Sequence, residues 1–196
     1  VEGAVFEVTN ADFHENSVKI FGYPYDHEKM KGLRDLFKHI NTLYAYRLNG
    51  GGAKASNTYA TAKFGGVRGN SLKIIIQKNV DDESMFDVKT VMDTTVVDVQ
   101  TVEKASDLEI NDFVEWKEAE LAVTAGIALE GGINGTVDGA SHQTYLDKIE
   151  SYSFNTLGVV TNEDTIKSLY VNFCKRLRDE VGAKFQVVVF NKAADY

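Results

Sequence analysis

A change of sequence periodicity constrains the fold more than any other feature of this chain. Between residues 71 and 126, apolar and polar side chains alternate in short stretches, whereas helical spacing appears only before and after this part. The alternating stretches are SLKIIIQK, FDVKTV, TTVVDVQTV, DFVEWKE and LAVTAG. Alternation buries one face of each stretch, and short strands joined by Asp- and Gly-bearing turns are typical of antiparallel structure. The middle of the chain is therefore predicted to be a compact antiparallel β unit.

Helices and apolar strands are expected on both sides of this β unit. Apolar residues recur every three or four positions over 27–40, after Asp26 as the expected N-cap, and over 165–181, before Gly182. A shorter helix is expected over 141–150, with Ser141 as its N-cap. Strands are also predicted over residues 5–9, 18–21, 42–48, 154–161 and 184–191, the last of them central in a sheet, and a flexible loop over 129–141.

The order of these elements predicts a mixed α/β (α+β) fold with a discontinuous core. A β-rich module is inserted into an α/β domain whose two halves lie far apart in the sequence. We expect residues 1–50 and 140–196 to form the discontinuous α/β core domain, and residues 51–139 to form an inserted antiparallel β-rich, acidic domain.

The charge of the chain is unevenly distributed. Asp81 to Glu130 contains fourteen acidic and three basic residues, a net charge of −11, whereas the rest of the chain carries a net charge of +3. The overall charge of −8 argues against nucleic acid as a partner, because binding to phosphates needs a basic surface. An acidic segment stays hydrated and repels its copies, while the near-neutral remainder can associate with its own kind.

The glycine-rich stretch from Arg47 to Asn70 fails the tests for a phosphate site. A P-loop needs a lysine where Asn70 stands, and no Gly-x-Gly-x-x-Gly follows a strand and opens a helix. We interpret these glycines as turn residues that let two backbones pass closely at a domain junction. The junction residues are predicted to be Arg47, Gly50, Gly51 and Gly52.

The remaining chemical candidates indicate no catalytic, cofactor or metal site. The four histidines lack the spacing of zinc ligands; they are His14, His27, His39 and His142. Cys174 is expected to be a small core residue, and as the one cysteine it excludes an internal disulfide and favours a cytosolic origin. Asp81-Asp82-Glu83 lacks the ligand spacing of a calcium loop. We therefore expect that the protein is not an enzyme.

The basic group Lys175, Arg176 and Arg178 has two interpretations. It is either the solvent face of an amphipathic helix, or a subunit contact for an acidic patch on a neighbouring copy.

The chain contains no run near the roughly 18–20 apolar residues that span a bilayer, so no membrane association is expected. It begins at Val1 without an initiator methionine or a signal peptide, and we interpret it as a fragment or a trimmed product.

Several long stretches resemble the tail sheath proteins of contractile-tailed phages and of phage-tail-like bacteriocins, the defective-prophage type included. They are LFKHINTLYAYRLNGGGAKASNTYATAKFGGVRGNSLKI, GGINGTVDGASHQTYLDKIESYSFNTLGVV and FCKRLRDEVGAKFQVVVFNKAADY. The most specific parts are residues 47–57, 62–74 and 186–196, and the resemblance extends over nearly the whole chain.

The resemblance implies a mechanical role. Subunits of this family stack as rings around an inner tail tube and are linked by terminal arms. A baseplate signal lets the sheath shorten and drive the tube through a cell envelope without nucleotide hydrolysis. The partners implied are other copies of the protein, the tube protein and the baseplate, in a virion tail or phage-tail-like particle assembled in the bacterial cytoplasm. Family members have further sequence on both sides, so this chain alone is expected to be a monomer or to associate weakly.

Two other functions remain open at this stage. A carbohydrate- or surface-binding module is the main alternative, because acidic β domains with exposed aromatics such as Trp116 bind sugars. An α/β hydrolase or transferase is disfavoured, because Gly-x-Ser-x-Gly is missing.

Overall fold

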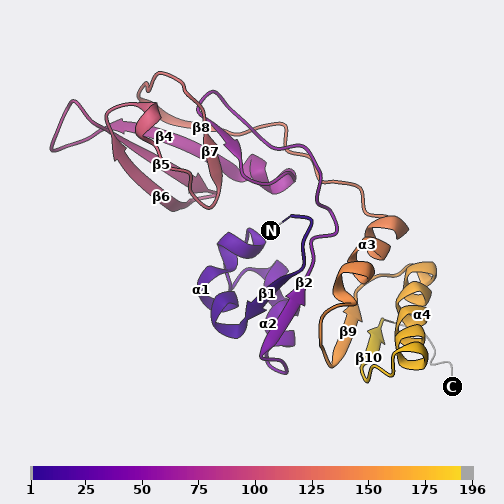
Figure 1. Cartoon of the computed structure of the whole chain (residues 1–196). Coiled ribbons are helices and arrows are strands. Elements are labelled where there is room, and N and C mark those ends of the chain that lie inside the picture. Colours follow the sequence, from indigo (N-terminus) through magenta and orange to yellow (C-terminus); the bar gives the residue numbers. More distant parts are fainter. Residues whose placement is uncertain (1, 191–196) are drawn as a thin grey trace. The chain divides into compact units, whose positions relative to one another are not determined.

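The computed structural model describes residues 2–190, which form a mixed α+β structure and confirm the predicted fold class (Figure 1). The chain divides into an N-terminal unit, Val1–Thr136, and a C-terminal unit, Val137–Tyr196. The joining of residues 1–50 and 140–196 into one domain stays a prediction. Among the described residues, no helix is both long and apolar enough to span a bilayer.

The N-terminal unit begins with a strand and a helix that share a capping box. Strand β1 (Phe6–Thr9) leads into helix α1 (Asn10–Phe21), where the Asp12 N–H donates to Thr9 Oγ1 at 3.1 Å and the Thr9 N–H donates to the Asp12 carboxylate at 3.1 Å. The Thr9 hydroxyl also donates to the Asp12 carboxylate at 2.6 Å, and this bond together with that from the Thr9 N–H lowers the pKa of Asp12. Gly22 ends the helix in a left-handed conformation (φ 78°).

Residues 18–21, predicted as a strand, are the last turn of α1. The capping box at Thr9 starts the helix. Apolar side chains of its last turn are packed: Val18 against the β core and Phe21 against the N-terminal core. The prediction was wrong because a β-branched and aromatic run of four residues fits a short strand equally well.

The remaining N-terminal elements are shorter than predicted. A 3₁₀ helix, η1 (Glu28–Met30), begins after His27 instead of Asp26 and leads into α2 (Lys31–Phe37). Strand β2 (Thr42–Ala45) pairs antiparallel with β1. The small core between these elements contains Val8, Phe13, Met30 and Phe37, with the Phe13 and Phe37 rings stacked at 5.0 Å.

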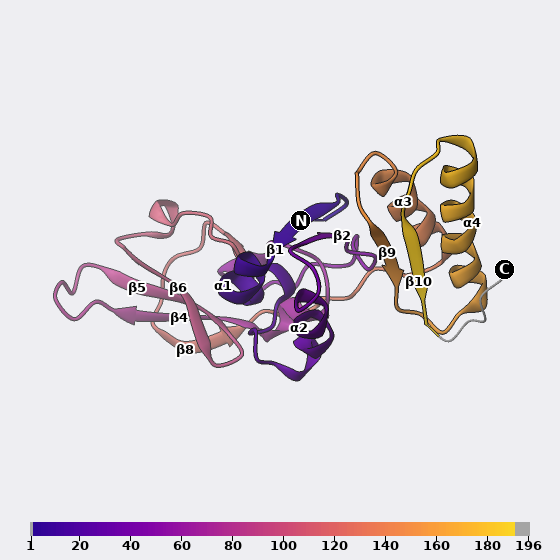
Figure 2. The same cartoon turned by 90° about the horizontal axis from the view of Figure 1, so that it is seen from below.

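The β domain runs from β3 to β8 and has two antiparallel sheets (Figures 1 and 2). The four-stranded sheet has the order β6-β5-β4-β8, and β3 pairs with β7 in a second sheet. The strands are β3 (Ala60–Ala62), β4 (Leu72–Lys78), β5 (Phe86–Met92), β6 (Thr95–Val102), β7 (Val114–Trp116) and β8 (Thr124–Ala128), with 3₁₀ helices η2 (Val67–Ser71) and η3 (Ala105–Asp107). The antiparallel β unit predicted from sequence alternation is confirmed.

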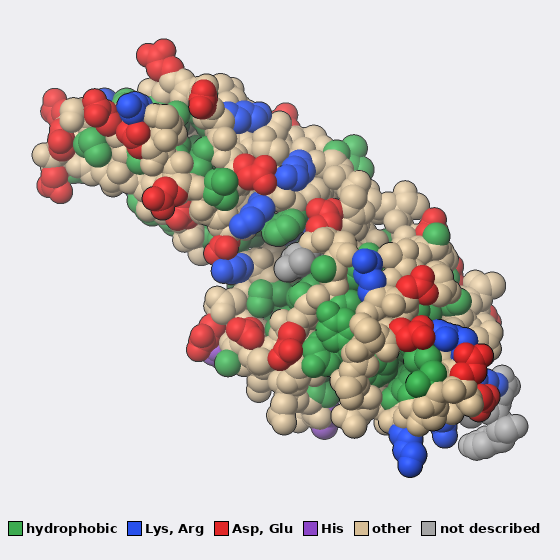
Figure 3. All heavy atoms as spheres, viewed as in Figure 1, with side chains coloured by type: hydrophobic (Ala, Val, Ile, Leu, Met, Phe, Trp, Pro, Cys, Tyr) green, Lys and Arg blue, Asp and Glu red, His purple; other side chains and the backbone are tan. Residues whose placement is uncertain are grey.

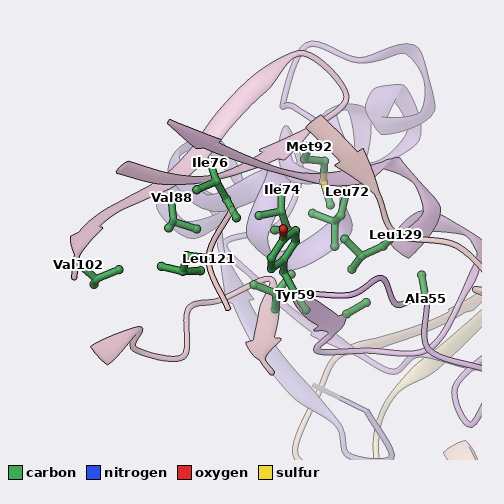
Figure 4. Close-up of a cluster of buried hydrophobic side chains, with 13 residues drawn as sticks. Ala55, Tyr59, Leu72, Ile74, Ile76, Val88, Met92, Val102, Leu121 and Leu129 are labelled. Carbon is green, nitrogen blue, oxygen red and sulfur yellow. The ribbon is translucent and has the colours of Figure 1, made fainter. Parts of the chain in front are cut away.

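Alternating side chains of β4 and β5 form the core of the β domain. Ile74, Ile76 and Val88 are fully buried and form one cluster with Tyr59 and Leu121 (Figure 4). Leu129, which follows β8, joins the cluster beside Leu72. Inward-facing, mostly apolar residues recur at every second position in β4 and β5. This is why the alternation in the sequence predicted these strands.

The C-terminal unit is a strand–helix–strand arrangement preceded by a helix. It contains α3 (Gly139–Ile149), β9 (Thr156–Val159), α4 (Asp164–Glu180) and β10 (Gln186–Val189). Strands β9 and β10 are parallel, and Leu157 and Val159 are buried while Gly158 and Val188 are exposed. Within the described part of the C-terminal unit, the helices therefore cover one face of the pair (Figure 2).

Two predictions for this unit need correction. Asp138 is the N-cap of α3, and Ser141 occupies the third helical position, where its hydroxyl completes a capping box. Within residues 2–190, β10 pairs with β9 alone and Val188 is 55% exposed, so β10 is not central in a sheet. The long helix and the left-handed Gly182 after it (φ 73°) agree with the prediction.

Truncation of the buried face of α4 tests this packing. Phe173 and Leu177 are each 5% exposed, so replacing either with alanine is expected to lower the free energy of unfolding by about 2–5 kcal/mol. Lys175→Ala on the exposed face of the same helix should change it by less than about 0.5 kcal/mol. Urea titration monitored by circular dichroism measures both, and equal small effects would contradict the assigned face.

Stability of the C-terminal unit should depend on the protonation of His142. Its Nδ1 lies 2.9 Å from the Tyr170 hydroxyl, and burial lowers the pKa of His142 below the usual 6.5 because imidazolium loses its hydration, although Glu163 and Asp138 oppose this. The unfolded chain binds the proton first, so the stabilisation is complete above pH 6.5 and is lost as the pH falls. We expect the wild-type free energy of unfolding to fall more steeply with decreasing pH than that of His142→Gln; parallel pH profiles would exclude this.

Candidate functional site

The described part of the chain offers no constellation for chemistry. No group of three or more His, Cys, Asp or Glu side chains within residues 2–190 is placed to hold a metal ion. Cys174 is buried, with Sγ 3.7 Å from the Phe185 carbonyl oxygen, as expected for a small core residue. Trp116 is half-buried against the β core, and its indole N–H donates to the Glu109 carbonyl at 2.8 Å.

A polar pocket of about 310 Å³ lies beside β6. Two of its polar side chains donate hydrogen bonds within the protein: Asn111 to Thr90 and Asp98, and Gln100 to the Glu109 carbonyl. The amide donors of Asn111 and Gln100 are therefore already used within the protein. Two structural features remain as candidates for a functional site. They are a meeting of glycine-rich segments and the basic residues of α4.

Three backbone segments meet where the chain enters and leaves the β domain, and we call this meeting the glycine junction. It comprises residues 49–53, 65–70 and 130–135. The first and third segments run antiparallel: the Gly135 N–H donates to the Asn49 carbonyl at 3.0 Å, and the Ile133 N–H donates to the Ala53 carbonyl at 3.1 Å. The Gly66 N–H donates to the same Ala53 carbonyl at 2.9 Å, which ties in the second segment.

Glycine is required at the points of closest approach. A Cβ atom on Gly52 would lie 2.6 Å from the Gly135 nitrogen and 2.7 Å from the Asn134 carbonyl carbon, closer than real Cβ contacts. A Cβ on Gly65 would lie 2.7 Å from the Gly52 carbonyl carbon. Since backbone atoms cannot move aside as side chains do, the segments approach this closely only because both residues lack a side chain.

Two asparagine side chains cross-link the segments. Asn70 accepts from the Gly132 N–H at 2.7 Å and donates to the Gly132 carbonyl at 3.0 Å. Asn134 Oδ1 accepts from the Val67 N–H at 3.1 Å. These bonds satisfy backbone groups that the irregular segments would otherwise leave unpaired.

The four residues predicted to form a domain junction lie in or beside this meeting. The Arg47 guanidinium donates to the Gly65 carbonyl and, through Nε, to Asn49 Oδ1 at 3.1 Å. Gly52 makes the closest backbone approach, Gly50 faces Gly135, and Gly51 has a left-handed φ of 74° with open space around it. Their role as a junction between domains stays a prediction.

Sequence reasoning missed half of this arrangement. Residues 129–141 were predicted to be a flexible loop, yet Leu129 and Gly132 are buried and the backbone of 130–135 is hydrogen-bonded. The signal available was the pair of Asn-Gly sequences and the matching glycine-rich composition of two distant segments. The cross-links by Asn70 and Asn134 had no local signature.

Arg68 was also missed, and it connects the β domain to the end of α1. Its Nε donates to the Gly22 carbonyl at 2.5 Å, its Nη1 donates to Asp93 at 2.9 Å, and its guanidinium lies 4.4 Å from the centre of the Tyr23 ring. The ion pair lowers the pKa of Asp93 and raises that of Arg68. Lys19 of α1 and Asp112 of the β domain form an ion pair at 2.9 Å.

The three basic residues of α4 do not form one patch. Arg176 pairs with Glu150, the C-cap residue of α3, Nη2 to Oε2 at 2.6 Å, which lowers the pKa of Glu150. Lys175 and Arg178 are exposed and, being three positions apart, share a helix face from which Arg176 is displaced. Of the group, Lys175 and Arg178 are therefore the better placed for a contact outside the chain.

Comparison with known proteins gives matches along most of the chain. Residues 49–134 match the model of the phage tail sheath protein beta-sandwich domain, and residues 135–196 match that of the phage tail sheath protein central domain. In Bacillus subtilis (strain 168), YqbK is 33% identical and the phage-like element PBSX protein XkdK is 34% identical, each over 93% of this chain and 44% of the relative.

Two solved structures are similar over the whole chain. A sheath tail protein from Desulfitobacterium hafniense is 35% identical with a TM-score of 0.89, and 48% of it is covered. The sheath tail protein Lin1278 from Listeria innocua is 34% identical with a TM-score of 0.82, and 46% of it is covered. The chain thus spans a little less than half the length of the relatives it matches.

Adding one methyl group tests the glycine junction. Gly52→Ala should lower the free energy of unfolding of the N-terminal unit by about 3 kcal/mol, because its Cβ would overlap backbone atoms. Gly32→Ala is the matched control: no atom lies within 4 Å of its Cβ position, and alanine favours the helix by about 0.5–1 kcal/mol. Urea titration measures both changes, and a neutral Gly52→Ala would contradict the described approach.

Proposed function

The chain belongs to the phage tail sheath protein family, and from this premise we propose that it is part of a subunit that polymerises around an inner tail tube and contracts. The observation that carries the proposal is the pair of sheath-domain matches, which adjoin at residues 134 and 135 and together extend over 49–196. Membership implies a structural, non-enzymatic role and a place in a phage tail or phage-tail-like particle. Contraction, assembly in the bacterial cytoplasm, and contacts with the tube protein and the baseplate are parts of the proposal.

The proposal includes the interrupted domain. In it, residues 1–50 and 140–196 form one α/β core, and residues 51–139 are inserted between its halves. The beta-sandwich match supports this division, because it begins at residue 49 and ends at residue 134, both within the glycine junction. In the assembled sheath, Arg47 and Gly50–Gly52 hold the two connections of the inserted domain together at this junction.

Charge supports the idea that copies associate through different surfaces. Acidic side chains gather over the end of the β domain where β4 and β5 are joined, and Asp81, Asp82 and Glu83 are exposed there (Figure 3). Lys175 and Arg178 present positive charge on α4. We assign these two residues, together with Arg176, which is paired with Glu150, to a contact with an acidic surface of a neighbouring copy. Salt would weaken this contact by screening the charges.

Electron microscopy of the full-length protein tests polymerisation. Tubes or stacked rings are expected at low ionic strength, because family members of this kind associate with their own copies. The 196-residue chain, which spans less than half of its relatives, is the comparison sample. A full-length protein that stays monomeric over a range of protein and salt concentrations would contradict the proposal.

Charge reversal tests the assigned contact separately. Lys175→Glu combined with Arg178→Glu in the full-length protein should reduce assembly by about tenfold or more, since buried or close charge pairs contribute a few kcal/mol. Lys148→Glu combined with Lys184→Glu makes the same change of charge at other exposed positions and serves as the control. Equal assembly of both variants, measured by sedimentation, would exclude the contact and leave polymerisation itself standing.

A further inference from the structure

The glycine junction contains both Asn-Gly sequences of the chain, Asn49-Gly50 and Asn134-Gly135. In such a sequence the asparagine side chain can cyclise onto the next backbone nitrogen, because glycine has no Cβ to obstruct the approach. The reaction needs a backbone nitrogen that is free to attack the side-chain amide carbon, and a donor to the amide oxygen assists it. The structure holds these groups differently at the two positions.

At Asn134 the nitrogen that would attack is held in a hydrogen bond. The Gly135 N–H donates to the Asn49 carbonyl at 3.0 Å, so the nitrogen is bonded within the junction. The Asn134 side chain accepts from the Val67 N–H at 3.1 Å. Cyclisation at this position would have to break the hydrogen bond of the Gly135 nitrogen, which also joins the first and third segments of the junction.

At Asn49 the arrangement favours the reaction. The residue lies in a turn and is half-buried, and among the described residues no hydrogen-bond acceptor is found for the Gly50 N–H. The Arg47 Nε–H donates to Asn49 Oδ1 at 3.1 Å. A charged donor at this oxygen withdraws electron density from the amide carbon and stabilises the negative charge that develops on the oxygen during attack.

We propose that Asn49 is a site of spontaneous covalent modification that Arg47 promotes. The Gly50 nitrogen loses its proton and forms a bond to Asn49 Cγ; the Cγ–Nδ2 bond breaks, and Nδ2 takes up a proton and leaves as ammonia. The product is a five-membered succinimide ring. Solvent water then adds to one of its two carbonyl groups and opens the ring to aspartate or isoaspartate at position 49.

The modification changes the junction in two ways. The new carboxylate lies beside the Arg47 guanidinium and competes with the Gly65 carbonyl for it. Isoaspartate also adds a methylene to the backbone three residues before Gly52, where the segments have no spare room. Modified chains therefore have a loosened connection between the β domain and the residues on either side of it.

The wild-type chain contains its own control for the test. The intact 196-residue chain is incubated at mildly alkaline pH, digested, and the aspartate and isoaspartate at both positions are quantified by mass spectrometry. In the folded chain we expect conversion at Asn49 to be about tenfold or more faster than at Asn134, and in urea we expect similar rates. Equal rates in the folded chain, or faster conversion at Asn134, would overturn the proposal.

Substitution of Arg47 tests its contribution. Arg47→Lys keeps the positive charge but removes the Nε–H donor, so conversion at Asn49 should slow by roughly tenfold. Arg178→Lys on the exposed face of α4 is the matched control and should leave the rate unchanged. A low rate at Asn134 in the Arg47→Lys variant verifies an intact junction; an unchanged rate at Asn49 in that variant would refute the role of Arg47.

Discussion

The N-terminal unit depends on direct contact between backbone segments at glycine residues, which have no side chain. The β domain has a conventional core, but its two connections to the rest of the chain are held together where Gly52, Gly65 and Gly135 leave no space for a Cβ atom. Packing of this kind brings carbonyl and N–H groups close enough to bond without a regular sheet, and Asn70 completes the bonding from the side. A larger residue at any of these positions would separate the segments and leave those polar groups unpaired.

The distribution of charge complements this rigid connection. The junction is built mainly from uncharged backbone groups. The β domain, in contrast, carries most of the net negative charge of the chain on its strands and turns. The ion pair between α1 and the β domain, Lys19 with Asp112, is partly exposed and therefore contributes little on its own. Arg68 forms its ion pair with Asp93 inside the β domain and reaches the end of α1 through a hydrogen bond to the Gly22 carbonyl. The net charge of the β domain thus acts mainly on its surroundings, whereas Arg47 and Arg68 are charged groups that bond to backbone carbonyls inside the N-terminal unit.

Sequence could predict what depends on local periodicity. The inward positions of β4 and β5, and the buried face of α4 with Phe173 and Leu177, follow directly from periods of two and of about 3.6. Local patterns did not predict the last turn of α1, where a four-residue run fitted both a strand and a helix and the capping box at Thr9 decided between them.

The glycine junction marks the limit of this kind of inference. Glycines in two segments some eighty residues apart have no periodicity to connect them, so their mutual contact could not be derived. It also has a mechanical consequence, because the entry and exit segments run antiparallel and their bonds are stacked along one line, from Asn49–Gly135 to Ala53–Ile133 and Ser56–Glu130. A force that separates the two segments breaks these bonds one after another from the outer end, whereas a force that slides them past each other stretches all of them at once. The attachment of the β domain is therefore weak in one direction of pulling and strong in another.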